Sequence, residues 1–502
     1  MSTVCARPRR RGSFALFVWA FVGVGLMLGA WSLATPIGAA PDEGAQTTQA
    51  AAIVRGQFDV RVQPLDGQPV SWVRVPCWVD NPYVHFQPPA CTPGHATTAV
   101  APTYFSNYPP LYYVVVGVPS LLLSGTTAIY AMRAAGDLLN TALVALGIWL
   151  ILRYHPRRLP LVGVLIALSP MVLFLMAVVN SSGLEIAAAF AAWCGMLCVV
   201  THPELPRALA AWTAVALIFL VLSRPTSPLD LLIIAVVLGL YVGWRGLRER
   251  LNPSVRRLWI PVAVALGVAA VFLVVDGAPH LIGVPPRHPA SLLSNMATTL
   301  RLTGGYVEQG VGDFGILNVP APTWVTAVWT ACLTALTAAA LVLSGPCRRA
   351  LPVLALAILV MTLALEAPKI NVVGLYFQGR YILPMLVGFP LVASSFEWRG
   401  RRTLPRPILT RSGFVVGIVL LVAQVGAFNG ALQTYKAGHG LNGATHWSPP
   451  GGELPVQVVF VVGAIVTLAL VVVMISGAGD QLLSTSAESE LAGRREKVTI
   501  PG

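Results

Sequence analysis

Charged side chains are scarce in this chain. Only 11% of its 502 residues are Asp, Glu, Lys or Arg, whereas soluble globular proteins carry about 25%. Hydrophobic residues make up 56% of the sequence, and a soluble core cannot bury that much apolar side chain. About a dozen apolar stretches are long enough, or nearly so, to cross roughly 30 Å of hydrocarbon. The composition therefore predicts an all-α polytopic membrane protein.

Several catalytic signatures are also missing. The sequence has no Walker A motif, no G-x-S-x-G, no H-E-x-x-H and no C-x-x-C pair, which argues against an ATP-driven pump, a serine hydrolase or a zinc protease. The net charge of +13 lies in short arginine clusters between apolar segments and forms no basic face with interleaved aromatics. We therefore expect no nucleic-acid partner.

These arginine clusters predict the orientation. They occupy the N-terminus, 153–158, 245–257 and 397–411, with a smaller cluster at 348–349. The positive-inside rule places all of them in the cytoplasm. We expect about twelve spans, with both termini inside; the apolar runs begin near residues 13, 128, 159, 184, 206, 228, 258, 322, 350, 381, 413 and 454.

The predicted organisation is one transmembrane domain over 13–477. A basic cytoplasmic N-terminus covers 1–12, and a polar, disordered cytoplasmic tail covers 478–502. The first apolar run, Ser13–Leu33, is longer than the 7–15 apolar residues of a signal peptide, so we expect it to stay as a span.

The main outer loops are expected at 36–127, 277–320 and 430–453. The first is long and chemically varied, and loops of that kind carry function, so chemistry is expected on the outer side. One further apolar run, Leu111–Leu123, does not fit the parity of the spans. We interpret it as a juxtamembrane or re-entrant helix.

Two cysteines, Cys77 and Cys91, share the first outer loop. An oxidising outer compartment favours a disulfide between them, and two free thiols are the alternative. Their spacing is not that of a zinc site.

Acidic residues stand at two predicted outer boundaries. Asp42 and Glu43 directly follow the first span, where a carboxylate can act as general base on an acceptor hydroxyl. The alternative is a helix N-cap. Glu185 lies just inside an apolar segment, a costly position that suggests function. There, the alternative is a helix start capped by Ser181 or Ser182, with Glu185 in the first turn.

Cations and aromatics also gather on the expected outer face. Arg380, Arg224 and Lys369 run against the orientation bias, and bidentate recognition of a phosphate is one reason for such a charge. Contacts with solvent or lipid headgroups are the alternative. Tyr108 and Tyr112 are candidates for stacking on a sugar, or for an aromatic belt at the interface.

Several short motifs occur together in an order that resembles GT-C membrane glycosyltransferases. Most closely they resemble a bacterial membrane-protein family called domain of unknown function 2142, common in actinobacteria, over about residues 13–475. The motifs are Pro41-Asp42-Glu43, Tyr108-Pro109-Pro110-Leu111-Tyr112, Ser169-Pro170-Met171, Asn180-Ser181-Ser182-Gly183-Leu184-Glu185, Gln378-Gly379-Arg380-Tyr381 and Trp447-Ser448-Pro449-Pro450.

The resemblance implies a GT-C-like fold and roles for particular residues. An acid in the first outer loop of GT-C enzymes is the catalytic base or a metal ligand, which corresponds to Asp42 with Glu43 beside it. Glu185 occupies the region of a second acidic motif but lacks its Asp-x-Asp, so a divalent metal ion stays open as a cofactor. The cationic groups that hold the lipid phosphate correspond to Arg380, Arg224 and Lys369. The polar groups that line the substrate site correspond to Tyr108, Tyr112, Asn180, Gln378 and Tyr381.

The implied function is transfer of a sugar from a polyprenyl-phosphate donor to a cell-envelope glycan, lipid or protein, at the outer face of a bacterial plasma membrane and among its lipids. A transporter or flippase of an envelope lipid, and a non-catalytic membrane scaffold, remain as alternatives. Sugar transfer requires a base and a phosphate-binding cation in one place. We therefore expect Asp42, Glu185 and Arg380 to converge on one outward-facing cavity.

Overall fold

The computed structural model describes residues 10–58, 61–62, 101–102, 105, 107–202, 205–250, 256–275, 286, 288–396, 406–437 and 447–477. Cys77 and Cys91 lie outside these residues, as do residues 1–9 of the expected N-terminal segment 1–12 and the tail 478–502; residues 10–12 belong to the first helix. Their predicted disulfide and disorder therefore stay predictions.

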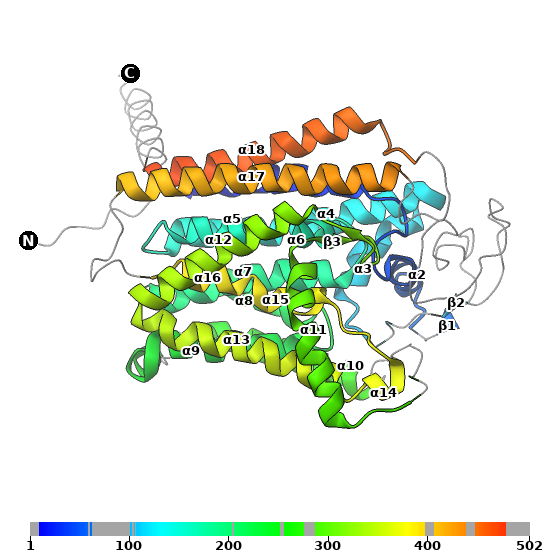
Figure 1. The fold of residues 1–502 in the computed structure, drawn as a ribbon, viewed down its shortest axis with the longest axis horizontal. Coiled ribbons are helices and arrows are strands. Elements are labelled where there is room, and N and C mark those ends of the chain that lie inside the picture. Colours follow the sequence, from blue (N-terminus) through cyan, green and yellow to red (C-terminus); the bar gives the residue numbers. More distant parts are fainter. Residues whose placement is uncertain are drawn as a thin grey trace, which may run out of the picture.

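Long apolar helices lie side by side in one bundle (Figure 1). Within the described residues, eight are long and apolar enough to cross a membrane. They are α1 (Arg10–Ala34), α4 (Gly125–Tyr154), α7 (Ser181–Thr201), α9 (Ser227–Arg250), α12 (Thr323–Leu343), α13 (Gly345–Glu366), α17 (Arg406–Lys436) and α18 (Glu453–Ser476). The all-α polytopic class is thus confirmed.

The other four apolar runs are also helical, but two are not continuous. Single helices form α8 (Arg207–Val221) and α10 (Arg256–Val275). The run from 159 is divided into α5 (Pro160–Ala167) and α6 (Pro170–Met176), and the run from 381 into α15 (Leu383–Leu386) and α16 (Gly388–Ala393). Each of these two runs is therefore formed by a pair of short helices, because proline removes a backbone donor and interrupts the helix.

The break between α5 and α6 shows how an interrupted helix persists in a bundle. Ser169 caps α6 by accepting a hydrogen bond from the Val172 amide. The freed carbonyls of Ile166 and Leu168 accept hydrogen bonds from Trp329 (2.8 Å) and Gln424 (2.6 Å). Neighbouring helices thereby satisfy backbone groups that lipid cannot.

One end of the bundle carries short elements (Figure 1). The segment Leu111–Leu123 forms α3 (Leu111–Gly117) and the 3₁₀ helix η2 (Val118–Leu121), which pack on α2 (Glu43–Ile53). Eleven helical residues span only about 16 Å, too little to cross the membrane. Near them β1 (Arg61–Val62) pairs antiparallel with β2 (Ala101–Pro102).

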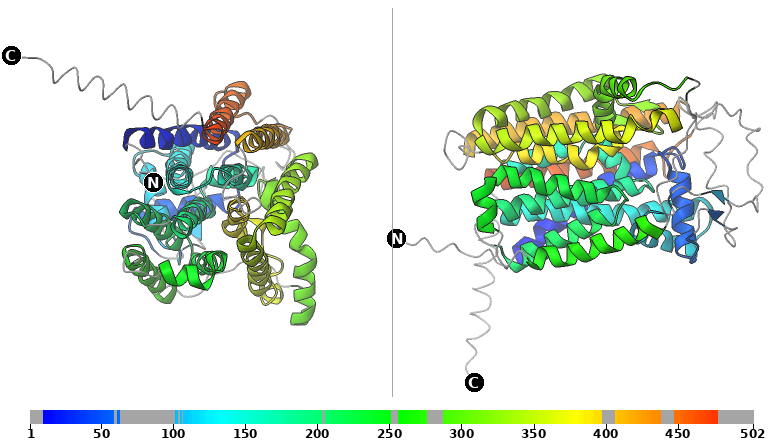
Figure 2. Two further views of the ribbon diagram at one scale, coloured as in Figure 1. Left: turned by 90° about the vertical axis from the view of Figure 1, so that its left-hand side faces the viewer. Right: turned by 90° about the horizontal axis from the view of Figure 1, so that it is seen from below.

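The region 277–320, expected as an outer loop, contains a helix of its own. α11 (Leu292–Gly312) runs across the long helices (Figures 1 and 2). It leads into β3 (Asp313–Phe314), which pairs antiparallel with β4 (Val319–Pro320). Further along the chain lie α14 (Ile370–Val373) and the 3₁₀ helix η4 (Gly379–Tyr381).

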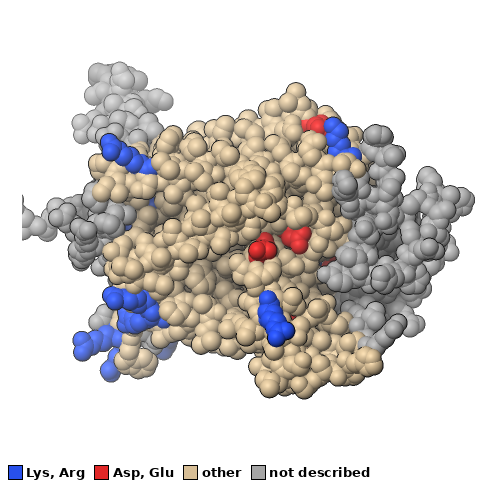
Figure 3. Space-filling model, in the orientation of Figure 1, with Lys and Arg blue, Asp and Glu red and all other residues tan. Residues whose placement is uncertain are grey.

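The arginine-rich turns meet at the opposite end of the bundle. Arg157 and Tyr241 both donate to the carbonyl of Ser395, and Arg349 donates to the carbonyl of Tyr241 (3.1 Å). Figure 3 shows most of the visible Lys and Arg gathered at the end where α1 begins and α18 finishes. The predicted cytoplasmic clusters 153–158 and 348–349 therefore share one face with Tyr241 and Ser395, which lie just before the clusters 245–257 and 397–411. That this face is cytoplasmic remains a prediction from the arginine bias.

Candidate functional site

Asp42 stands at the N-cap position of α2 but does not act as its cap. Its backbone is left-handed (φ 57°, ψ 7°), and its side chain makes no capping hydrogen bond. Instead the carboxylate accepts from Arg380 Nη2 at 2.5 Å. The Asp42 side chain is 44% exposed, whereas that of Arg380 is 4% exposed. A non-glycine residue in this backbone region is uncommon and calls for support from its surroundings.

Glu43 supplies part of that support from the next position. Both of its carboxylate oxygens lie 2.7 Å from the guanidinium of Arg133 on α4. The Gly38 amide donates to one oxygen (2.8 Å), and the Val179 amide donates to the other (3.3 Å). Glu43 is 1% exposed. Its carboxylate is thus committed to holding the Asp42 turn and is not open to an acceptor.

Asn180 holds the same turn from the other side. It donates to the Pro41 carbonyl (2.7 Å) and accepts from Gln46 (3.1 Å) and from the Ser182 amide (2.9 Å). Asn180 is therefore the N-cap of α7, and the expected cap at Ser181 or Ser182 was wrong. Glu185 consequently lies beyond the first turn, so the helix-start explanation does not account for it.

Glu185 belongs to a second buried ion pair. Its carboxylate lies 2.9 Å from Arg224 and accepts from the Ser227 hydroxyl at 2.7 Å. Arg224 also donates to the hydroxyl of Tyr108 (3.2 Å). Burial raises the pKa of Tyr108 above its ordinary value, although Arg224 acts against the rise. The phenol therefore stays protonated at neutral pH.

Tyr381 joins the two ion pairs. The guanidinium carbons of Arg224 and Arg380 each lie 5.0 Å from the centre of its ring, within range of cation–π attraction. Arg380 also donates to the Tyr381 hydroxyl (3.1 Å). We call Asp42, Arg380, Tyr381, Arg224 and Glu185 the outer charge cluster. It brings together the three charged residues that the sequence analysis expected to converge.

Both arginines of the outer charge cluster keep an unused donor. Nε of Arg224 and Nε of Arg380 are buried and have no hydrogen-bond partner in the described part of the chain. Burial acts to lower the pKa of Arg380, yet attraction to Asp42 holds it above its ordinary value. The cluster thus contains two fixed positive charges with donors left for an anion.

Asp230 is a neighbour that the sequence analysis missed. It lies in the first turn of α9, is 3% exposed and interacts electrostatically with Glu185 and Arg224. A second buried acid therefore stands beside the ion pair of Glu185 and Arg224. The sequence did contain a signal for Asp230, because this acid lies just inside an apolar run that follows a short turn. The same signal had identified Glu185 as a candidate.

The remaining predicted residues lie beside the outer charge cluster or away from it. Lys369 is exposed at the start of α14, and among the described residues no ion pair of its side chain is seen. Gln378 directly precedes η4, and its Oε1 is buried without a partner within the described ranges. Tyr112 is fully buried against Tyr113, with ring centres 5.4 Å apart.

The donor set does not fit a divalent metal ion. Asp42 and Glu185 are each neutralised by an arginine at hydrogen-bond distance, so cations already occupy the places that a metal would take. Among the described residues there is no group of three or more His, Cys, Asp and Glu side chains suited to a metal. We therefore derive no step through a metal.

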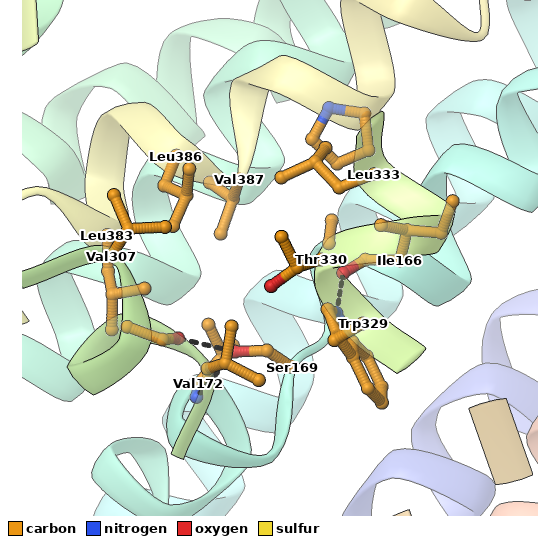
Figure 4. Close-up of a pocket in the computed structure, with 14 residues that line it drawn as sticks. Ile166, Ser169, Val172, Val307, Trp329, Thr330, Leu333, Leu383, Leu386 and Val387 are labelled. Carbon is orange, nitrogen blue, oxygen red and sulfur yellow. Dashed lines mark hydrogen bonds between the residues drawn. The ribbon is translucent and has the colours of Figure 1, made fainter. Parts of the chain in front are cut away.

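An apolar cavity lies between the broken helices, α11 and α12 (Figure 4), and none of the residues of the outer charge cluster lines it. Val307, Thr330 and Leu386 are among its lining residues, and none of the lining residues is titratable. It therefore supplies no acid, base or cation to a reaction.

The fold and the outer charge cluster define a polytopic α-helical membrane protein in which the ion pairs Asp42–Arg380 and Glu185–Arg224 lie together at one end of the bundle. The chain belongs to the family described as predicted membrane protein (DUF2142), whose model matches residues 26–389. The expected family is thus confirmed, and the match contains all five residues of the outer charge cluster. No curated protein matches the chain.

Among solved structures, the chain is similar to the crystal structure of ArnT from Cupriavidus metallidurans in the apo state. The TM-score is 0.43, and 14% of the aligned residues are identical. The match covers 92% of this chain and 78% of that chain.

Proposed function

We propose that this protein is a membrane glycosyltransferase. It moves a sugar from a polyprenyl-phosphate donor to a cell-envelope acceptor on the outer face of a bacterial plasma membrane. One observation carries the proposal: a half-exposed carboxylate, Asp42, touches a buried guanidinium, Arg380, at the end of the bundle opposite the arginine-rich turns. Sugar transfer from a lipid phosphate needs a base and a phosphate-binding cation side by side.

In this reaction Asp42 takes the proton of an acceptor hydroxyl. The hydroxyl oxygen bonds to the anomeric carbon of the sugar with inversion, while the bond from that carbon to the phosphate oxygen breaks. The lipid phosphate leaves with the electron pair. Arg380 and Arg224 stabilise its negative charge through donors that include their unused Nε–H groups.

The contact between Asp42 and Arg380 gives donor binding a second role. While the Arg380 guanidinium donates to it at 2.5 Å, the Asp42 carboxylate is engaged and is not available to an acceptor. A phosphate that competes for Arg380 draws the guanidinium away, and Asp42 then becomes free to accept a proton. The base is thus released only when a donor is present.

The test uses purified full-length protein in detergent. It is incubated with radiolabelled polyprenyl-phosphate sugars and envelope extract. We expect label in the acceptor fraction with the native protein and none with Asp42→Asn. In reconstituted vesicles, label that crosses the membrane without entering the acceptor would overturn the proposal in favour of a transporter.

Binding of polyprenyl phosphate itself is a second measurement, and it requires no knowledge of the sugar. The native protein should bind it, because the lipid phosphate is the leaving product. A protein that neither transfers label nor binds the lipid phosphate would favour a non-catalytic scaffold.

A further inference from the structure

A second polar group lies inside the bundle on α4. Asp137, Asn140 and Thr141 follow one another at helical spacing, so their side chains share one face of the helix. They are 8%, 0% and 1% exposed. None of them belongs to the outer charge cluster, and an ionisable residue within a spanning helix suggests a function of its own.

Each of these side chains keeps an oxygen without a partner. The Oδ1 atom of Asp137 is buried and has no hydrogen-bond partner among the described residues. Asn140 donates through Nδ2 to the Met176 carbonyl (2.8 Å), which leaves its Oδ1 unused. The hydroxyl of Thr141 is likewise unpartnered in the described ranges.

Tyr112 adds a further hydroxyl from α3. This hydroxyl is buried and has no partner in the part of the chain that the structure describes. A Cβ atom placed on Gly136, the neighbour of Asp137, would lie 3.8 Å from it. The glycine thus allows the Tyr112 hydroxyl to approach α4 closely.

Arg133, one turn away on α4, uses its donors on groups other than Asp137. Its Nε and Nη2 groups bind Glu43, and its other N–H groups donate to three carbonyls at 2.6–3.1 Å. These five contacts equal the five donors of a guanidinium. Asp137 is therefore a buried acid without a committed counterion, which is a costly arrangement in a membrane interior.

The unused atoms are suited to a small cation. The free oxygens of Asp137 and Asn140 accept but do not donate when the acid is ionised, so they call for a positive charge. Carboxylate, amide and hydroxyl oxygens are the ligands that hard cations prefer. With one carboxylate present, a monovalent ion gives a neutral site, whereas a divalent ion would leave an uncompensated charge.

We propose that Asp137, Asn140 and Thr141 form a binding site for Na⁺ between α1 and α4. The site lies against α1, where a Cβ atom on Gly25 would be 3.8 Å from the Thr141 hydroxyl oxygen, and against α6, whose Met176 carbonyl accepts from Asn140. A ligand that binds the folded state alone stabilises it in proportion to the logarithm of its concentration.

The test is thermal unfolding of the full-length protein in detergent, at constant ionic strength and pH 8. Sodium chloride is compared with N-methyl-D-glucamine chloride. We expect the unfolding temperature to rise with Na⁺ and to saturate. Asp137→Asn should lose the response, and about one equivalent of radioactive Na⁺ should bind the native protein and none the variant.

Thr141→Val keeps the shape of the side chain and removes one oxygen. It should raise the half-saturating Na⁺ concentration about tenfold. If Asp137→Asn does not fold, this variant tests the proposal in its place. Thr362→Val is the matched control, because the Thr362 hydroxyl is buried on α13 and bonds its own helix at the Ile358 carbonyl. That variant should respond to Na⁺ as the native protein does.

Two results would overturn the proposal. One is an equal response to Na⁺ and to the organic cation. The other is stabilisation by lowering the pH to which Na⁺ adds nothing, which would mean that Asp137 binds a proton in place of the ion. Neither measurement uses a sugar donor, so the outcome is independent of the proposed transferase activity.

Discussion

The guanidinium of Arg380 donates a 2.5 Å hydrogen bond to the carboxylate of Asp42, 338 positions earlier in the chain. Arg380 is buried and Asp42 is half-exposed. The ion pair therefore has one side fixed in the protein and one side open to a substrate. This asymmetry distinguishes it from the pair of Glu43 and Arg133, where both side chains are fully enclosed.

Asp42→Asn should abolish sugar transfer and leave the protein folded. The amide cannot take a proton, and loss of a general base lowers rates by about 10²–10⁴-fold. Asparagine tolerates the left-handed backbone of this position and can still accept from Arg380. The measurements are transfer of radiolabel and gel filtration of the purified variant. Transfer at the native rate would remove Asp42 from the reaction.

Arg380→Ala should weaken binding of polyprenyl phosphate by at least about tenfold, or 1.4 kcal/mol, because the lost charge is buried and directed at the site. Lys369→Ala is the matched control, since Lys369 is an exposed cation and should matter little. Both dissociation constants can be measured in detergent. A larger effect from Lys369→Ala would place the phosphate elsewhere.

Arg133→Met should destabilise the protein severely. Removing one partner of a buried ion pair leaves an uncompensated charge and costs about 3–5 kcal/mol. Adding Glu43→Gln should recover part of the loss, because the remaining side chain is then neutral. The yield of monodisperse protein and its unfolding temperature measure both effects. Failure of the double variant to improve on Arg133→Met would contradict the account.

Stability should fall as the pH drops from about 6.5 toward 4. Burial lowers the pKa of His155 to about 4, so the unfolded chain binds a proton in this range while the folded protein does not. One pKa unit corresponds to about 1.4 kcal/mol, so at pH 5 the native protein should have lost about 2 kcal/mol more than His155→Gln. Unfolding at pH 7.5 and pH 5 compares them, and parallel losses would exclude His155 as the cause.

Exposed positions at the two ends of the bundle test the orientation. In a background without native cysteines, Lys369→Cys should react with an impermeant maleimide in intact cells. Arg348→Cys should react only after the membrane is opened. Both side chains are exposed, so access to the reagent depends on the side of the membrane. The reverse pattern would invert the assigned topology.

The sequence was sufficient to predict the apolar helical runs and to identify the residues of the outer charge cluster. Each run is helical because apolar composition alone decides burial in lipid, and the charges near run ends stood out as costly exceptions. Asp42 and Arg380 are close because the run before Asp42 finishes, and the run after Arg380 begins, at the same end of the bundle.

The sequence did not reveal which charged residues near or inside the apolar runs are held by a buried partner and so have a structural role. Arg133 lies inside an apolar run and neutralises Glu43, and only the packing of α4 on α1 shows this. The helix breaks were also missed. A proline predicts an interruption, but whether the chain tolerates it depends on side chains such as Trp329 and Gln424, which are distant in sequence.

The break between α5 and α6 has a consequence for biosynthesis. The carbonyls of Ile166 and Leu168 are satisfied by Trp329 and Gln424, which the ribosome adds more than 150 residues later. Until α12 and α17 enter the bilayer, these carbonyls lack their final partners, and an unpaired carbonyl in hydrocarbon is costly. The first half of the chain is therefore not a finished unit when it leaves the ribosome, and a truncation before α17 would expose this break to lipid.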